Sequence, residues 1–597
     1  LTGRYAYQAG QESLHYASTT AEMLGAAGYH TMMVGKWHLS QQPTDFGFSR
    51  YFGHLSGACN YYRGDKTFRL NGEPFQVPES GFYTTVANVD YAMRFLNEAR
   101  QQQGGKPWYL HVAFNAPHAP LQPLKEDYEK YLGRYSAGWD VIHAARAARQ
   151  KELGLVSESV QAAPRPDHLP AWSDLPPDRQ KWEERRMTAL AGMIDRVDQE
   201  VGRLVEDLRK HGELDRTLIL FVSDNGACPY DRTSQHMELE PYQPETSWSD
   251  STGWSWVRNT PFRLYKQNQH EGGIRTPGIV HWPEGLKTPP GAIVSDPVHL
   301  VDVLPTLAAL TGAEIPEEWP ERELRPIAGI SFDAVLKGKP LGPRPPLYFL
   351  FGSDRGLRKG PWKLVSFRSG PWELYDMLED PTELNDLAGE HPEIRDALIA
   401  EWTALSKEMD HAPAKSWEPV ATTLEPGMDR HPEWTDFTQP LGPVGKHATH
   451  SGKGKRRAKD DSVRARRGTD LEKRRGEWIL TCTGDDPGLA FDRLRGIEQP
   501  GPYRLSFRIK SQATGEGDVF WTTDAETKLP DGTRRTFPVE HDGEWHEVTV
   551  EIPSEQPLQG LRLDPCGGSG QVTLTDLRLL DAAGNELISW IKPAQRQ

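Results

Sequence analysis

The chain has 597 residues, a net charge of −15, 37% hydrophobic residues and 19 tryptophans. Because domains average roughly 150 residues, this length predicts two or three units instead of one compact core. The acidic balance argues against a general nucleic-acid binder, and no apolar run approaches the ~20 residues that a transmembrane helix needs.

The chain starts with Leu1-Thr2-Gly3-Arg4 and has no initiator methionine. We interpret these residues as the end of a motif whose first half lies upstream of Leu1. A secretory signal peptide would also lie upstream, so the sequence itself leaves localisation open. Thr-Gly-Arg is also an ordinary turn, and the interpretation depends on the segments that follow.

Helical and strand patterns alternate along the first two thirds of the chain. Thr19 and Glu22 form a capping-box pattern, Gly28 marks a helix end, and residues 29–34 follow as a short strand. Further along, an amphipathic helix precedes the apolar strand 217–222; the apolar positions on its one face are Ile194, Val197, Val201, Leu204 and Leu208. An unbroken apolar strand is typical of a strand covered on both faces. The pattern predicts an α/β fold with a mainly parallel sheet sandwiched by helices.

The last third of the chain differs from the first two. Residues 446–475 contain twelve Lys or Arg against four Asp or Glu, a local charge of +8, and predict a disordered linker. A sharper hypothesis is that this basic stretch attracts an anionic polysaccharide. From residue 476 to 597, short alternating runs such as 503–509, 545–550 and 572–577 predict an antiparallel β-sandwich. The expected division is therefore 1–445, 446–475 and 476–597.

The four cysteines are widely spaced and show no C-x-x-C pattern, so they indicate neither a zinc site nor a disulfide framework. Cys59 and Cys228 are interpreted as small buried residues. Cys482 and Cys566 both fall in the predicted sandwich, where a bridge and a pair of buried thiols fit equally well.

Four predicted strand ends carry polar side chains. These are Lys36 and His38, His118 after the strand 108–114, Asp224 and Asn225 after the strand 217–222, and Lys266 ahead of the strand 279–282. Ligands of open α/β sheets collect at the carboxyl ends of strands. Each feature has a structural alternative: Asp224-Asn225-Gly226 is a common turn, the lysines could be solvated and the histidines could be structural. Their coincidence in one sheet favours a site.

These segments resemble the sulfatase family from Leu1 to about Ala388. Leu1-Thr2-Gly3-Arg4 matches the end of the family signature Cys/Ser-x-Pro-Ser-Arg-x-x-Leu-x-Thr-Gly-Arg. Further matching segments are residues 46–48, 57–62, 259–263, 356–364 and 373–381, and residues 134–140 look like the bacterial arylsulfatase branch. The resemblance implies an alkaline-phosphatase-like domain.

The resemblance also implies roles for the polar residues. Asp224 and Asn225 match the metal ligands, which suit Ca²⁺ or alternatively Mg²⁺. Lys36 and Lys266 match the sulfate-binding lysines, His38 matches the histidine that contacts the nucleophile, and His118 matches the one beside the bridging oxygen. The family nucleophile is formylglycine, whose hydrate attacks sulfur and forms a covalent sulfo-enzyme intermediate.

The expected activity is therefore hydrolysis of aryl or carbohydrate sulfates, with the nucleophile upstream of Leu1 and the present chain inactive. The implied partners are a sulfated small molecule or polysaccharide and a formylglycine-generating or anaerobic sulfatase-maturating enzyme, and the implied location is the periplasm or the cell exterior. Two alternatives stay open. One is a phosphonate or phosphodiester hydrolase of the same superfamily, although Asn225 fits a one-metal site better than a two-metal site. The other is a non-catalytic glycan-binding protein whose sandwich stacks sugars on Tyr503, Trp521 or Trp545.

Overall fold

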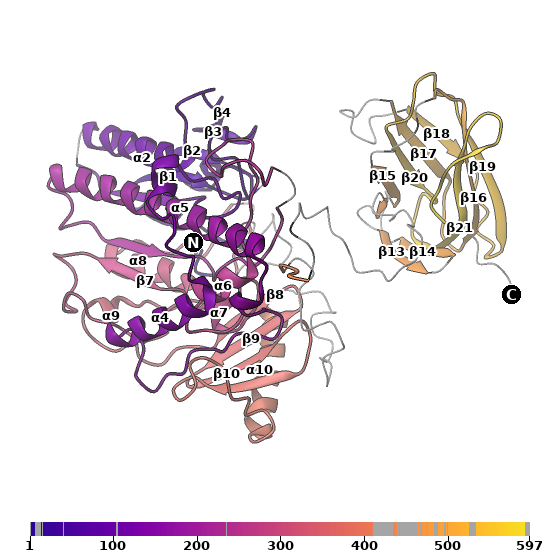
Figure 1. Cartoon of the computed structure of the whole chain (residues 1–597). Coiled ribbons are helices and arrows are strands. Elements are labelled where there is room, and N and C mark those ends of the chain that lie inside the picture. The colour runs from indigo at the N-terminus through magenta and orange to yellow at the C-terminus, as the bar shows by residue number, and fades with distance from the viewer. Residues whose placement is uncertain are drawn as a thin grey trace. The chain divides into compact units, whose positions relative to one another are not determined.

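The computed structural model forms two compact units, Leu1–His450 and Ser451–Gln597, which we call the N-terminal and C-terminal units (Figure 1). It describes residues 2–5, 14, 16–39, 41–102, 105–233, 236–320, 322–409, 434–438, 441, 463–465, 469–474, 476–482, 487–492, 494, 497, 499–523 and 533–591. None of the helices within these ranges is long and apolar enough to span a bilayer.

The N-terminal unit is built on a five-stranded sheet with the order β4-β3-β2-β1-β5. Its strands are β1 (His30–Lys36), β2 (Arg50–His54), β3 (Phe68–Leu70), β4 (Glu73–Pro74) and β5 (Trp108–Ala113). The central strand β1 pairs in parallel with both β2 and β5, whereas β3 and β4 add antiparallel at one edge. The carboxyl ends of β1 and β5 therefore meet at one edge of the sheet.

Helices cover both faces of this sheet, as the α/β pattern predicts. Met32 and Val34 of β1 pack in one cluster with residues of α2 (Thr84–Gln101), and α5 (Pro177–Lys210) packs against α2 (Figure 1). Met33, which points to the opposite face, packs with Ala21 of α1 (Thr20–Ala26). The predicted capping box is confirmed, since Thr19 and Glu22 each bond the other's backbone N–H.

Strand β6 (Ile219–Val222) differs from its prediction. It pairs antiparallel with β7 (Gly278–His281) in a two-stranded sheet, and the side chains of Phe221 and Val222 are 44% and 39% exposed. The expectation that this strand is covered on both faces is therefore wrong for the described part of the chain. The reason is that an apolar run records which side chains can be buried, but not whether a neighbouring element covers them.

A second, four-stranded antiparallel sheet follows in the N-terminal unit, with the order β11-β10-β9-β8. Its strands are β8 (Leu347–Phe351), β9 (Asp354–Lys359), β10 (Trp362–Ser366) and β11 (Trp372–Asp376), and α10 (Pro392–Met409) packs on them. The remaining α-helices of the unit are α3 (Lys125–Glu129), α4 (Gly138–Glu152), α6 (Thr252–Arg258), α7 (Glu271–Ile274), α8 (Val303–Thr311) and α9 (Asp333–Leu336).

The C-terminal unit is the predicted antiparallel sandwich. One sheet has the order β12-β15-β20-β17-β18 and the other β13-β14-β21-β16-β19, with β22 added to β21. Leu505 and Phe507 of one sheet share an apolar cluster with Leu561 and Leu563 of the other. The strands are β12 (Val463–Ala465), β13 (Thr469–Arg474), β14 (Glu477–Cys482), β15 (Leu489–Asp492), β16 (Tyr503–Ser511), β17 (Gly517–Thr522), β18 (Thr533–Phe537), β19 (Trp545–Ile552), β20 (Gly560–Asp564), β21 (Gly570–Leu580) and β22 (Glu586–Ser589).

The sandwich begins earlier than predicted. Strands β12 and β13 lie inside the segment 446–475 that we expected to be a disordered linker, and they pair with β15 and β14. The prediction is wrong for these residues because Val463 belongs to the sandwich core and Leu471 packs against it, although few apolar residues surround them in the chain. Residues 446–462 lie outside the described residues.

The aromatic residues proposed for sugar stacking are mostly core residues. Tyr503 and Trp521 are 1% and 4% exposed and belong to the apolar cluster between the sheets. The Arg508 guanidinium lies 5.4 Å from the ring centre of Trp545. Stacking on Tyr503 or Trp521 is therefore excluded without rearrangement of the core.

Candidate active site

Five of the six predicted site residues follow strand ends of the N-terminal unit, but the prediction that these ends belong to one sheet is wrong, since β6 lies in a different sheet from β1 and β5. Lys36 is the last residue of β1, and His38 follows in a left-handed backbone conformation with φ of 63°. His118 follows β5, and Asp224 with Asn225 follow β6. Lys266 lies between α6 and α7.

Electrostatic coupling shows that five of these six side chains share one region. Burial lowers the pKa of Lys36, Lys266 lowers it further, and Asp224 opposes the shift. Burial also lowers the pKa values of His38 and His118, and both lysines lower each of them further. Such effects act between groups that lie near one another in a partly desolvated site. Asn225, the sixth residue, adjoins Asp224 in the chain.

His38 lies against a residue that has no side chain. A Cβ atom on Gly57 would come within 2.4 Å of His38 Nε2, closer than any normal contact. The absence of a side chain at Gly57 thus leaves the space that the imidazole ring fills. The sequence showed Gly57 only as part of the matching segment 57–62. The packing explains why a glycine is needed at this position.

Hydrogen bonds fix the orientation of His118. Its Nδ1 lies 2.8 Å from the carbonyl oxygen of Ala119, which can only accept, so Nδ1 carries the proton. Tyr61 donates its hydroxyl to the carbonyl of His118 at 2.8 Å. Nε2 is consequently the nitrogen of His118 that can exchange a proton with another group.

The segment of Asp224 and the segment of Lys266 touch through their backbones. The Lys266 N–H donates to the Ala227 carbonyl at 3.0 Å, and the Gly226 N–H donates to the Gly273 carbonyl at 2.9 Å. A Cβ on Gly226 would lie 1.8 Å from the carbonyl oxygen of Gly272, so no side chain fits there. We call this contact the glycine seam (Gly226, Gly272 and Gly273).

The sheet β8–β11 supports the chain that follows Lys266. The Asn268 side chain donates to Asp354 at 3.1 Å, and His270 Nε2 lies 2.9 Å from a carboxylate oxygen of Glu373. Lys363 Nζ, fully buried, lies 2.7 Å from carboxylate oxygens of both Glu271 and Glu383. These contacts join residues nearly 100 positions apart and fix the segment that carries Lys266.

Two residues beside the site were not predicted to belong to it. Cys59 is 5% exposed, as expected of a buried thiol, and it acts to raise the pKa of Lys36. Its Sγ lies 3.6 Å from the Asn115 side-chain nitrogen. Asp250, 3% exposed, forms an ion pair with Arg258 and raises the pKa of His118 against the larger effect of burial. Neither residue stands in a strand-end pattern, so the sequence offered no signal for them.

Asp224 and Asn225 fit a hard cation by the chemistry of their donors. The Asp224 carboxylate is exposed, and Asn225 uses its Nδ2 to donate to the Gly226 carbonyl at 3.0 Å, which leaves Oδ1 as an acceptor. One anionic and one neutral oxygen belong to the ligand set of Ca²⁺ or Mg²⁺, and either ion needs further oxygen ligands.

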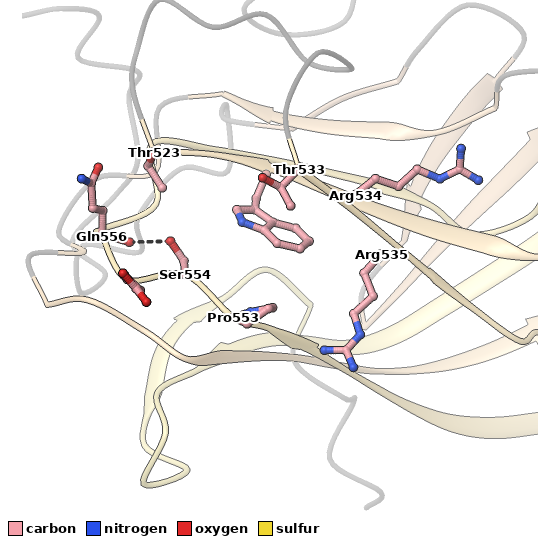
Figure 2. A pocket seen from close by; sticks show the side chains of 9 residues that line it. Thr523, Thr533, Arg534, Arg535, Pro553, Ser554 and Gln556 are labelled. Atoms are coloured by element: carbon pink, nitrogen blue, oxygen red, sulfur yellow. Dashed lines mark hydrogen bonds between the residues drawn. The ribbon is translucent and has the colours of Figure 1, made fainter.

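The C-terminal unit has a cavity and a cluster of potential metal ligands that were not predicted from the sequence. An open cavity of about 650 Å³ is lined by Trp521, Thr523, Thr533, Arg534, Arg535, Pro553, Ser554, Glu555 and Gln556 (Figure 2). Arg534 bonds Asp518 at 2.9 Å and Arg535 bonds the Glu551 carbonyl at 3.0 Å, so both arginines are engaged. Among the described residues, Glu540, Asp542 and His546 also cluster at metal-ligand spacing, but they lie on the exposed surface of the sandwich. Neither feature contains a predicted site residue.

The chain matches two family models and is similar to several known proteins. The family model described as Sulfatase matches residues 1–313, and the model described as N-sulphoglucosamine sulphohydrolase, C-terminal, matches residues 262–408. An uncharacterized sulfatase of Schizosaccharomyces pombe is 31% identical over 385 residues, which cover 58% of this chain and 68% of the relative. An arylsulfatase of Klebsiella aerogenes is 28% identical over 348 residues, covering 54% and 74%. A solved structure of Ps i-CgsB in complex with k-i-k-neocarrahexaose is 23% identical and covers 71% of this chain and 83% of its own, with a TM-score of 0.49.

Proposed function

The chain belongs to the sulfatase family, and from that premise we propose that its N-terminal unit hydrolyses sulfate esters of aryl or carbohydrate alcohols. We place the nucleophile, a formylglycine made from Cys or Ser by a separate maturation enzyme, upstream of Leu1. The support is the match of Leu1-Thr2-Gly3-Arg4 to the end of the signature that surrounds it. When present, formylglycine would supply the nucleophile for the transfer of the sulfate group.

The observation that carries the proposal is the pair of coupled lysines. Lys266 lowers the pKa of Lys36, and both lysines lower the pKa values of His38 and His118 in the same partly buried site. Two cations at close range repel one another, so their arrangement costs free energy unless an anion joins them. A sulfate ester is such an anion, and fixed cations stabilise the negative charge that grows on its oxygens during transfer.

His118 is the proposed general acid. Its Nδ1 proton is held by the Ala119 carbonyl, so Nε2 is the atom that protonates the leaving oxygen. Burial and the two lysines lower its pKa, which favours the neutral ring in the empty site. A bound sulfate ester brings negative charge that offsets the lysines and raises this pKa, so substrate binding itself prepares the acid.

Asp224 and Asn225 are the proposed ligands of a calcium or magnesium ion, which would neutralise charge beside the sulfate. His38, held against Gly57, is assigned to the nucleophile side of the site. The chain's own contribution is therefore to bind and orient the sulfate through Lys36 and Lys266 and to deliver a proton through His118. We also propose that the protein acts in the periplasm or outside the cell on sulfated small molecules or polysaccharides.

One experiment tests the proposal. The chain 1–597 and the same chain extended upstream of Leu1 as its gene encodes it would be produced together with a formylglycine-generating enzyme and assayed for sulfate release from 4-nitrophenyl sulfate. We expect turnover only from the extended protein, lost in Lys36→Met and kept in Lys359→Met, an exposed lysine paired with Glu401. Sulfate release by the chain 1–597 alone would overturn the assignment of the nucleophile. Faster turnover of a phosphonate monoester than of the sulfate would favour the phosphoryl-transfer alternative.

A further inference from the structure

Two cysteines of the C-terminal unit lie side by side in its core. The Sγ atoms of Cys482 and Cys566 are 3.4 Å apart, and the residues are 2% and 1% exposed. Cys482 ends β14 in one sheet, whereas Cys566 follows β20 in the other sheet. The contact therefore bridges the two layers of the sandwich and residues 84 positions apart in the chain.

We propose that Cys482 and Cys566 form a disulfide that links the two sheets when the protein folds in an oxidising compartment. A disulfide needs its sulfur atoms at about 2.05 Å, so closure requires an approach of only about 1.4 Å. The backbone around the pair is already fixed. Cys482 stands opposite Gly570 in the β14–β21 register, and the N–H of Gly567, next to Cys566, donates to Thr514 at 3.0 Å.

A metal site explains this pair less well. Zinc sites built on thiolates require four ligands, usually Cys or His. Among the described residues, these two thiols have no third His, Cys, Asp or Glu ligand atom at metal-ligand spacing, since the cluster that meets this condition is Glu540, Asp542 and His546. Two buried thiols in contact with each other, without further ligands, match the geometry of a disulfide precursor.

The oxidation is a thiol–disulfide exchange with a donor disulfide such as oxidised glutathione. The Cys566 thiol loses its proton and attacks one donor sulfur, which expels the first donor thiolate and leaves a mixed disulfide. The Cys482 thiol, after losing its own proton, attacks the Cys566 sulfur and expels the second donor thiolate. The two cysteines give up two electrons and two protons in total, and the donor disulfide is reduced to two thiols. Because both sulfurs are buried, this exchange takes place before the sandwich closes.

A count of free thiols gives the first test. The full chain would be unfolded, refolded with a mixture of reduced and oxidised glutathione, quenched with acid and alkylated in denaturant. We expect two alkylated cysteines, Cys59 and Cys228, and a peptide pair joined through Cys482 and Cys566 by mass spectrometry. The same chain treated with a reductant should show four alkylated cysteines. Four alkylated cysteines in the oxidised sample would overturn the proposal.

Thermal unfolding gives a second test that does not depend on alkylation of the thiols. A cross-link that closes a loop of this length is expected to raise the unfolding midpoint of a unit of this size by on the order of 10 °C. Reductant should therefore lower the midpoint of the C-terminal unit in the native sequence but not in the double variant Cys482→Ala, Cys566→Ala. The matched variant Cys59→Ala should keep the full response to reductant. Equal midpoints with and without reductant in the native sequence would contradict the proposal.

Discussion

The two units of the chain are stabilised by different kinds of interior. The N-terminal unit buries ion pairs, such as Lys363 with Glu271 and Glu383, and Arg186 with Asp231 at 2.8 Å. The C-terminal unit is organised around one apolar cluster that joins both of its sheets, and it also holds a buried ion pair, Arg562 with Asp564, within strand β20. Apolar contacts stabilise without direction, whereas buried ion pairs hold groups in fixed orientations and are costly when one partner is missing. In the N-terminal unit such pairs join separate segments of the chain, and this is the unit that we propose orients charged side chains around an anion.

The largest effect is expected for catalysis, which we propose for the N-terminal unit. In the protein extended upstream of Leu1, His118→Ala should lower kcat for an alkyl sulfate by ~10²–10⁴-fold, because a poorly activated alcohol needs the proton that Nε2 supplies. Arg535→Ala, which alters the cavity of the C-terminal unit, should leave kcat unchanged. Steady-state kinetics of both variants decide the matter, and full activity of His118→Ala would remove the assigned role.

The next largest effect concerns the buried charges themselves. Lys363→Met should destabilise the N-terminal unit by about 3–5 kcal/mol, because Glu271 and Glu383 are left buried without their cation. Lys359 ends the neighbouring strand β9 and forms an exposed ion pair with Glu401. Lys359→Met removes this pair and should lower the free energy of unfolding by no more than about 1 kcal/mol. Urea unfolding followed by circular dichroism measures both values. Similar losses in the two variants would mean that the buried network does not hold this unit.

Acid should destabilise the N-terminal unit more than the C-terminal unit. Burial lowers the pKa of His54 and of His143 to about 4, so between pH 6.5 and 4 the unfolded chain binds protons that the folded N-terminal unit does not. The free energy of unfolding of this unit should fall through that window by up to about 3 kcal/mol for each histidine. Asp542 raises the pKa of His546, which stabilises the C-terminal unit at low pH and loses that effect as the pH rises.

Unfolding midpoints at pH 7, 5.5 and 4.5 test this difference. His143→Phe should keep the stacking on Trp256, whose ring lies 3.9 Å from the imidazole, and should flatten the pH dependence of the N-terminal unit. A C-terminal unit that loses as much stability in acid as the N-terminal unit would contradict the expectation.

The smallest effect on stability, and an informative one for function, is expected at Gly57. Gly57→Ala places a Cβ within 2.4 Å of His38 Nε2, and the exposed imidazole can move aside at little cost in stability. The displaced ring should nevertheless lower kcat by about 10-fold, since small misplacements of an active-site group slow the reaction. Gly202→Ala has open space around its Cβ and should leave kcat unchanged. Unchanged kcat in Gly57→Ala would show that the position of His38 is not critical.

Local patterns in the sequence were sufficient to predict much of this structure. The capping box at Thr19, the strand β1 and the alternating strands of the sandwich depend on side chains within a few residues, so their signals are contained in short windows. The grouping of Lys36 and His118 followed from the rule that polar strand ends of one sheet meet, whereas Lys266 comes from the chain between α6 and α7.

The features that could not be predicted depend on distant partners. Cys59 and Asp250 come beside the site from loops, and β12 forms because a strand almost thirty residues later pairs with it. The exposure of Phe221 likewise depends on what covers β6, which no window of the sequence contains. Pairing across long separations is decided by the whole fold, so composition alone gave the wrong prediction for residues 463–465 and 469–474.

The glycine seam sets a limit on how this protein can be altered. A side chain at Gly226 would come within 1.8 Å of the Gly272 carbonyl oxygen, so a substitution there must separate the segment of Asp224 from the segment of Lys266. A side chain at Gly272 would come within 2.1 Å of the Arg263 carbonyl oxygen and would disrupt the segment of Lys266 itself. A mutational scan should find these positions intolerant even of alanine. Libraries intended to change the range of substrates should therefore leave the seam constant.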